Sequence, residues 1–182
     1  GGNIREGCAI GPMCRIHGEI EESIIYGYSN KHHDGFLGHA YLGEWVNLGA
    51  FTTNSDLKND YTSVKLYIKG ELVDSGDLKV GSIIGDHTKT SIGTIINTGA
   101  MIGIMSNLVG SGNLIPKFIP SFCWFLNNKV TKGFGLTHMI ETAAKSMSRR
   151  KVDLTSEERT MLNHVFELTR EERKFWIKKS FS

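Results

Sequence analysis

The stretch Ile-Asn-Thr-Gly-Ala-Met-Ile-Gly-Ile-Met-Ser-Asn-Leu, residues 96–108, places an aliphatic residue at every sixth position, at Ile96, Ile102 and Leu108. An amphipathic helix repeats about every 3.6 residues and a half-buried strand every two, so neither gives this period. A triangular solenoid does. Each hexad then forms one short strand and a corner, three hexads complete one turn, and the aliphatic side chain points into the prism.

The same rhythm extends over much of the chain. Further aliphatic positions are Ile4, Ile10, Ile16, Leu42, Leu48, Ile84 and Leu114. Small or β-branched residues follow four positions after an aliphatic, where the corner is expected to narrow: Cys8, Cys14, Val46, Thr52, Thr88, Ala100 and Ser106. Glycine often comes directly after the aliphatic, and we expect it to ease the turn because it adopts positive φ without cost. The alternative interpretation is the scattered strands of an ordinary sandwich.

The sequence therefore predicts a mainly β fold, a parallel β-helix of hexapeptide repeats with C-terminal α-helices. We expect the β-helix over residues 1–115, interrupted near 61–80 by an alternating segment that reads as a hairpin. Residues 116–135 hold prolines and aromatic residues without the period, and we expect an irregular arm there. Residues 136–182 show helical spacing.

Composition limits the class of protein. The chain has 182 residues, a formal charge of +2 and dispersed basic residues, which is unlike a nucleic-acid-binding surface. No apolar run reaches the length of a membrane span. Three cysteines, an odd number, favour reduced thiols in the cytoplasm over a disulfide framework. The repeats begin almost at the first residue, so we expect further coils or another domain before them.

The segment Tyr-Ser-Asn-Lys-His-His-Asp-Gly, residues 28–35, breaks the period and concentrates polar side chains. A histidine that titrates near neutrality can take a proton from an attacking amine or hydroxyl, and a neighbouring carboxylate can orient its ring. Residues 52–59 add amides, hydroxyls and a cation that suit a sugar.

Two other interpretations of the histidine pair stay open. His32 and His33 are either surface residues of a loop or part of a metal site with Asp34 or His39. Consecutive residues of an extended segment point in opposite directions, and no second ligand cluster has a recognisable spacing, so no metal is expected. Cys8 and Cys14 are interpreted as packing residues.

Residues 35–54 resemble the C-terminal domain of the bifunctional N-acetylglucosamine-1-phosphate uridylyltransferase/glucosamine-1-phosphate acetyltransferase. Within them, the aliphatic positions before Val-Asn-Leu-Gly-Ala are five apart, Leu37 to Leu42, as in that family. Across residues 4–150 the chain resembles sugar-phosphate nucleotidyltransferases that carry a C-terminal left-handed β-helix. The left-handed winding expected here follows from this resemblance.

The resemblance implies a trimer that binds acetyl-CoA or another acyl-CoA between neighbouring β-helices. It places His33 at the general base. Asn30, Lys31, His32, Asp34, Asn54 and Lys58 are the expected substrate-binding residues, and Ser91 and Gly110 the expected cofactor-binding residues. Two family features are missing, because the Arg-Pro-Gly coil that holds the sugar phosphate is absent and the family's lysine falls near Glu21. Lys31 or Lys58 is the hypothetical replacement.

Three functions follow from these expectations. The first is an acyl-CoA-dependent acyltransferase acting on a sugar phosphate or nucleotide sugar, within a protein that also carries a nucleotidyltransferase domain. The second is a non-catalytic domain that trimerises and regulates such a nucleotidyltransferase. The third is a metal-dependent hydratase, which needs three histidines meeting across an interface.

Overall fold

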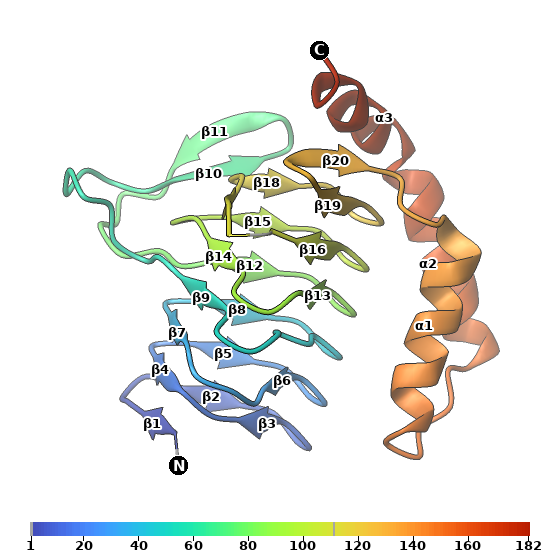
Figure 1. Ribbon diagram of the computed structural model, residues 1–182, viewed down its shortest axis with the longest axis horizontal. Coiled ribbons are helices and arrows are strands. Elements are labelled where there is room, and N and C mark those ends of the chain that lie inside the picture. The colour runs from blue at the N-terminus through green and yellow to red at the C-terminus, as the bar shows by residue number, and fades with distance from the viewer. Residues whose placement is uncertain (1, 111) are drawn as a thin grey trace.

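The computed structural model describes residues 2–110 and 112–182 and has the shape of a three-sided prism with helices along one side (Figure 1). Short strands stack in parallel register from one coil to the next, as in the pairing of Ile84 with Leu42 below and Ile102 above. The period of six thus builds a parallel β-solenoid followed by three helices, as predicted. This architecture is consistent with the left-handed winding that the resemblance implies.

Each side of the prism is a stack of short strands, and on the second face all six are hydrogen-bonded into one sheet. The first face contains β1 (Asn3–Ile4), β4 (Glu19–Glu21), β7 (Phe36–Gly38), β9 (Thr53–Asn54), β14 (Ile95–Ile96) and β17 (Leu114–Ile115). The second face contains β2 (Ala9–Ile10), β5 (Ile24–Ile25), β8 (Tyr41–Leu42), β12 (Ile83–Ile84), β15 (Met101–Ile102) and β18 (Phe118–Ile119). The third face contains β3 (Arg15–Ile16), β6 (Asn30–Lys31), the bridging residue Asn47, β13 (Lys89–Thr90), β16 (Asn107–Val109), β19 (Trp124–Leu126) and the antiparallel β20 (Lys129–Thr131).

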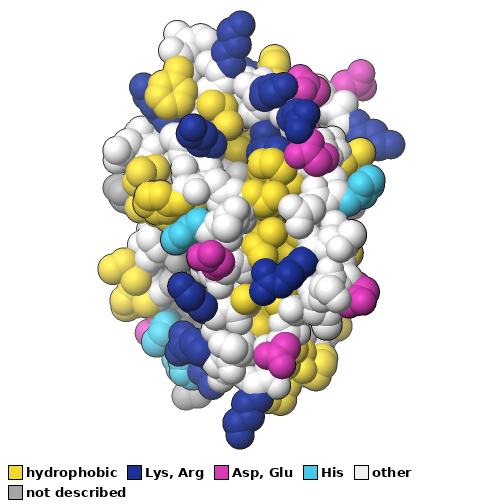
Figure 2. Space-filling model, turned by 90° about the vertical axis from the view of Figure 1, so that its right-hand side faces the viewer, with side chains coloured by type: hydrophobic (Ala, Val, Ile, Leu, Met, Phe, Trp, Pro, Cys, Tyr) yellow, Lys and Arg dark blue, Asp and Glu magenta, His cyan; other side chains and the backbone are white. Residues whose placement is uncertain are grey.

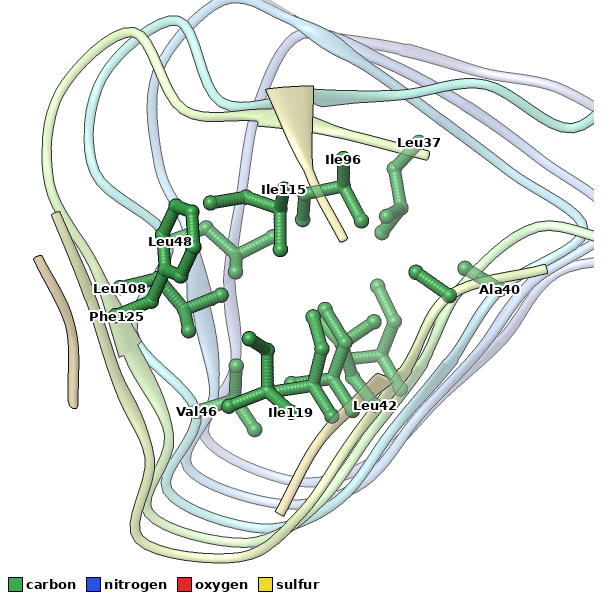
Figure 3. Packing of buried hydrophobic residues seen from close by; sticks show 14 of the residues in the cluster. Leu37, Ala40, Leu42, Val46, Leu48, Ile96, Leu108, Ile115, Ile119 and Phe125 are labelled. Carbon is green, nitrogen blue, oxygen red and sulfur yellow. The ribbon is translucent and has the colours of Figure 1, made fainter. Parts of the chain in front are cut away.

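Aliphatic side chains fill the prism, viewed along its axis in Figure 3. Leu42, Ile84, Ile96 and Leu108 are fully buried there, as the repeat predicts. The predicted inward position of Leu114 is wrong. Leu114 is 53% exposed, and the neighbouring Ile115 points into the prism instead. The longer corner between β16 and β17 shifts the phase by one residue, and a shift of one residue exchanges the two sides of a strand.

The glycines after the aliphatics have a different role from the one expected. None of Gly11, Gly43, Gly49, Gly85 and Gly103 has a positive φ. They are required by the next coil, because a Cβ at Gly103 would lie 2.3 Å from the backbone nitrogen of Ser121. Positive φ occurs at other positions, and the corner between the second and third faces carries a column of large residues with positive φ: Met13, Tyr28, Trp45, His87, Met105 and Phe122.

Residues 116–135 do not form an irregular arm. β18 pairs with β15 and β19 pairs with β16, so this segment continues the solenoid before β20 turns back on β19. Phe125 points into the prism and Phe122 joins the corner column. The segment lacks the period because aromatic residues occupy positions that aliphatic residues hold elsewhere.

Two additions flank the prism. The hairpin of β10 (Lys65–Ile68) and β11 (Glu71–Asp74) projects between β9 and β12. Helix α1 (Leu136–Ser148) runs along the third face, followed by α2 (Ser156–Leu168) and α3 (Arg170–Lys179) (Figure 1). Thr155 and Glu158 form the predicted capping box at the start of α2. The described residues include no helix long and apolar enough to cross a membrane.

Candidate functional site

A cavity of about 520 Å³ lies between the C-terminal end of α1 and the third face of the prism. It is lined from the solenoid by Arg15, Asn30, His32, His33 and Lys89, among others. The helix side contributes Ser146 of α1 and, just after its last residue, Arg149 and Arg150. On the helix-bearing side of the molecule, Lys, Arg and His side chains gather at the lower left (Figure 2). The volume is in the usual range for a small-molecule site.

The polarity of the third face explains why a cavity persists here. From the first coil upward its outward positions are Arg15, Asn30, Asn47, Lys89 and Asn107, and only the last of the parallel strands places an aromatic residue, Trp124, there. At the other end of α1, Met139 and Ile140 pack against Met105 and Phe122 of the corner column. An apolar contact therefore fixes the upper part of the helix, while its lower end faces a polar ladder that it does not fill.

Hydrogen bonds connect that lower end to the solenoid. Arg150 Nη2 donates to Asn30 Oδ1 at 2.7 Å, and Arg150 Nη1 donates to the Met13 carbonyl at 3.2 Å. Asn30 Nδ2 in turn donates to Asn47 Oδ1 at 3.1 Å. Asn30 thus lines the predicted site but is already bonded within the protein.

The two histidines that the sequence singled out both border the cavity. His32 and His33 are exposed, and their ring centroids are 5.2 Å apart in an edge-to-face arrangement. Asp34 does not orient His33. Its carboxylate lies 3.2 Å from Nδ1 of His17, on a separate depression beside β4 and β7.

Lys31 is not on the surface. Its side chain points into the prism and is 1% exposed, with Nζ donating to the carbonyls of His17 and His33. Burial lowers the pKa of this amine. Lys31 therefore does not line the cavity, and its amine instead fixes the backbone that carries His33.

Asn54 and Lys58 also lie away from the cavity. Asn54 is 5% exposed, and its side-chain amide both donates to the Gly38 carbonyl and accepts from the Gly38 N–H, each at 2.9 Å. Asn54 occupies an inward position that Ile96 holds in the next coil. Its amide provides hydrogen-bond partners for the backbone of Gly38 in the neighbouring coil. Lys58 lies 3.3 Å from Asp60 in the loop before the hairpin.

Ser91 and Gly110, the expected cofactor contacts, lie between the third and first faces, at the corner that carries His33 further down. Ser91 Oγ is 3.2 Å from Thr94 Oγ1 at that corner, and Gly110 is buried. Two exposed apolar side chains lie on the same edge: Phe51 is 66% exposed and Ile92 is 75% exposed.

Sequence reasoning missed two titratable groups next to the cavity, the half-buried Lys89 and the buried His87. Lys89 extends between the main cavity and a smaller one of about 110 Å³ under α1, and Nζ donates to the His87 carbonyl at 2.9 Å. Burial lowers the pKa of Lys89 to about 8. Burial, together with the charge of Lys89, lowers the pKa of His87 to about 4.

A second missed feature is a histidine–carboxylate pair at another corner of the prism. His39 Nδ1 lies 2.8 Å from Asp56 Oδ2, and both side chains are largely buried. The two residues are far apart in sequence and meet because successive coils stack. This pair occupies the corner between the first and second faces, so it does not join the His33 cavity.

No group of three or more His, Cys, Asp or Glu side chains close enough to hold a metal ion occurs in residues 2–110 and 112–182. All three cysteines are free.

The fold thus defines the chain as a hexapeptide-repeat β-solenoid domain, and comparison with known proteins adds named relatives. No family model matches. The chain is 36% identical over 90 residues to the bifunctional sugar-1-phosphate nucleotidylyltransferase/acetyltransferase of Sulfurisphaera tokodaii, which covers 50% of this chain and 22% of that protein. It is 35% identical over 104 residues to the bifunctional protein GlmU of Methanocaldococcus jannaschii, covering 57% and 25% respectively. A match to GlmU of Gloeothece citriformis is 28% identical over 131 residues.

These relatives confirm the resemblance for about half of the chain. The matched part spans about a quarter of the length of each relative.

Proposed function

We propose that this chain is a domain of a sugar-nucleotide enzyme and acts as an acyl-CoA-dependent acyltransferase on a sugar phosphate or nucleotide sugar, with His33 as the general base. One observation carries the proposal: exposed His33 borders a cavity whose other polar side chains include four cations, Arg15, Lys89, Arg149 and Arg150. The names of the relatives, which join nucleotidyltransferase and acetyltransferase activities, support the same reaction.

The chemistry assigned to His33 is proton transfer. No described residue donates or accepts a hydrogen bond with the His33 ring, so its nitrogens face solvent and are available to a substrate. As the acceptor's amine or hydroxyl attacks the thioester carbonyl, His33 takes the proton that the nucleophile loses. The bond between carbonyl carbon and sulfur then breaks, and the thiolate leaves and takes up a proton.

Acetyl-CoA or another acyl-CoA would supply the activated acyl group. The edge of the prism that runs from His33 past Phe51 and Ile92 to Ser91 and Gly110 is where we propose that it lies. The exposed apolar side chains on this edge suit the apolar parts of such a molecule. Free cysteines throughout the chain suit a reducing compartment such as the cytoplasm.

We propose that the domain assembles as a homotrimer. A closed cyclic trimer needs two different contact patches on each subunit. The helices cover the third face, which leaves the first and second faces. The outward positions of the second face include Ile24, Tyr41, Ile83 and Met101, and those of the first face include Ile95 and Leu114. Rows of apolar side chains of this kind mark protein–protein contacts.

The test is turnover of acetyl-CoA in the presence of amino-sugar and hydroxy-sugar phosphates, measured as free thiol released. We expect His33→Ala to lose at least about a hundredfold in kcat, the usual contribution of general base catalysis. His164→Ala is the matched control, because His164 is exposed on α2 away from the cavity. Equal turnover in His33→Ala and the parent would exclude the role of His33.

The second candidate is a non-catalytic domain that trimerises and regulates a nucleotidyltransferase. The observation that favours it is that no carboxylate among residues 2–110 and 112–182 orients His33, since Asp34 faces His17 instead. Under this function the protein is trimeric by sedimentation but releases no thiol with any of the sugar phosphates. A trimer with turnover that depends on His33 contradicts it.

A further inference from the structure

The cavity concentrates positive charge without an internal counter-ion. Arg15, Lys89, Arg149 and Arg150 line it, and no Asp or Glu of the described residues is among its lining side chains. None of the four cations lies within 4.0 Å of a carboxylate in residues 2–110 and 112–182. Like charges brought together in this way repel one another unless an anion compensates them.

The pKa of Arg150 reflects the positive charges around it. Burial lowers the pKa of its guanidinium, and the charges of Arg15 and Arg149 lower it further. The bonds from Arg150 to Asn30 and to the Met13 carbonyl go to neutral acceptors, which leave its charge uncompensated. These two hydrogen bonds hold Arg150 in a fixed orientation beside Arg15 and Arg149.

We propose that these residues form a phosphate clamp, in which Arg149 and Arg150 at the C-terminal end of α1 and Arg15 and Lys89 of the solenoid bind the phosphoryl group of a phosphate ester. Arginine forks match phosphate oxygens in pairs, and several cations are suited to a doubly charged group rather than to a single carboxylate. The clamp would replace the two phosphate-binding features that the sequence lacks. It rests on the proposed function for the sugar part of the ligand, whereas phosphate binding itself requires no turnover.

Phosphate binding to the clamp should affect how α1 docks on the solenoid, because the clamp joins the two. Two of the clamp's four cations lie at the C-terminal end of the helix and two come from the coils, so a phosphate bound between them contacts both. Binding should therefore also stabilise the docking of α1, as any ligand that binds only the folded arrangement does.

Direct binding to the purified chain tests the clamp by calorimetry. The probes are glucosamine 1-phosphate, glucosamine, coenzyme A and inorganic phosphate. We expect glucosamine 1-phosphate to bind at least about tenfold more tightly than glucosamine. We expect Arg15→Gln and Arg149→Gln each to raise the Kd for the phosphate ester by about tenfold or more. Lys145→Gln is the control, since Lys145 is exposed on α1 and does not line the cavity.

The outcomes separate this inference from the proposed function. Phosphate-dependent binding that persists in His33→Ala, with no thiol release by the parent, supports the clamp and removes the acyltransferase. Acyl transfer with the same KM for the sugar phosphate in the parent and Arg149→Gln overturns the clamp and keeps the acyltransferase. Equal affinity for glucosamine and its phosphate, or no binding of any phosphate probe to folded protein, also overturns it. If only the binding of coenzyme A or of inorganic phosphate weakens in Arg15→Gln and Arg149→Gln, the clamp is supported, but the phosphate group that it binds does not belong to a sugar phosphate.

Discussion

Arg150, just beyond the end of α1, donates a 2.7 Å hydrogen bond to the Asn30 side chain on the second coil. The two residues are 120 positions apart in the sequence. Their contact lies in the lining of the cavity and ties the lower end of the helix to a face that the helix does not otherwise fill.

Replacing Arg150 with alanine should loosen this end of α1. Two hydrogen bonds from a charged, half-buried donor are lost, while the repulsion from Arg15 and Arg149 is relieved. Since a hydrogen bond to a charged group contributes about 1.5–3 kcal/mol, we expect a net fall of about 1–2 kcal/mol in the free energy of unfolding. Urea unfolding measures it. Arg149→Ala, an exposed neighbour, should change the value by less than about 0.5 kcal/mol, and equal effects of the two would contradict the prediction.

His87 should make the protein sensitive to acid. Its pKa is about 4 in the folded state, against 6.5 as its ordinary value, so the unfolded chain binds more protons between these two pH values. Stability therefore rises with pH across this window and is lost as the pH falls from about 6.5 to 4. The difference corresponds to on the order of 3 kcal/mol at most.

The corner column itself supplies the variant for this test. Met13 and Met105 hold the equivalent positions with similar positive φ values, so His87→Met introduces a residue that this corner already accommodates. It also removes the Nδ1 atom of His87, which is buried without a hydrogen bond. The stability of His87→Met, followed by urea unfolding at pH 4.5 and 7, should vary less with pH than that of the parent. An unchanged pH dependence would show that another group is responsible.

Much of the prism could be predicted from the sequence because its rule is local. An aliphatic residue such as Ile96 or Ile102 is inward whatever lies elsewhere in the chain. The rule failed where the corner length changed, at Leu114, and where aromatic residues replaced aliphatic ones, at Phe125. The glycines after the aliphatic residues were visible in the sequence. The reason for them was not, because Gly103 is required by the close approach of the next coil, which a local pattern does not reveal.

The candidate site was predicted only in part, for a similar reason. His32 and His33 were visible because polar residues concentrate in one break of the repeat. The cations Arg149 and Arg150 were not, since nothing in a helical pattern says which face of a solenoid the helix will cover. Lys31 was misplaced because its position is an inward rung, and a charged residue is an unusual occupant of such a rung.

Lys89 should make phosphate binding depend on pH. Its pKa is about 8, so its amine loses most of its charge between pH 7 and 9 while the arginines keep theirs. If Lys89 contributes to the clamp, the Kd for glucosamine 1-phosphate should rise as the pH is raised through 8. Lys89→Arg keeps the charge at all these values and should bind with little change over the same range. A parent protein and a Lys89→Arg variant with parallel pH profiles would remove Lys89 from the clamp.

His39→Asn separates the two candidate histidines. His39 has a positive φ of 49°, a conformation that asparagine tolerates better than most residues, so this change keeps the corner intact. It removes the 2.8 Å contact with Asp56, and we expect the free energy of unfolding to fall by about 1–2 kcal/mol. Because His39 lies at a different corner from the cavity, acetyl-CoA turnover at a temperature where the variant is folded should stay within about threefold of the parent. A loss of turnover by His39→Asn comparable to that of His33→Ala, with the fold intact by circular dichroism, would move the catalytic assignment to the corner that holds His39 and Asp56.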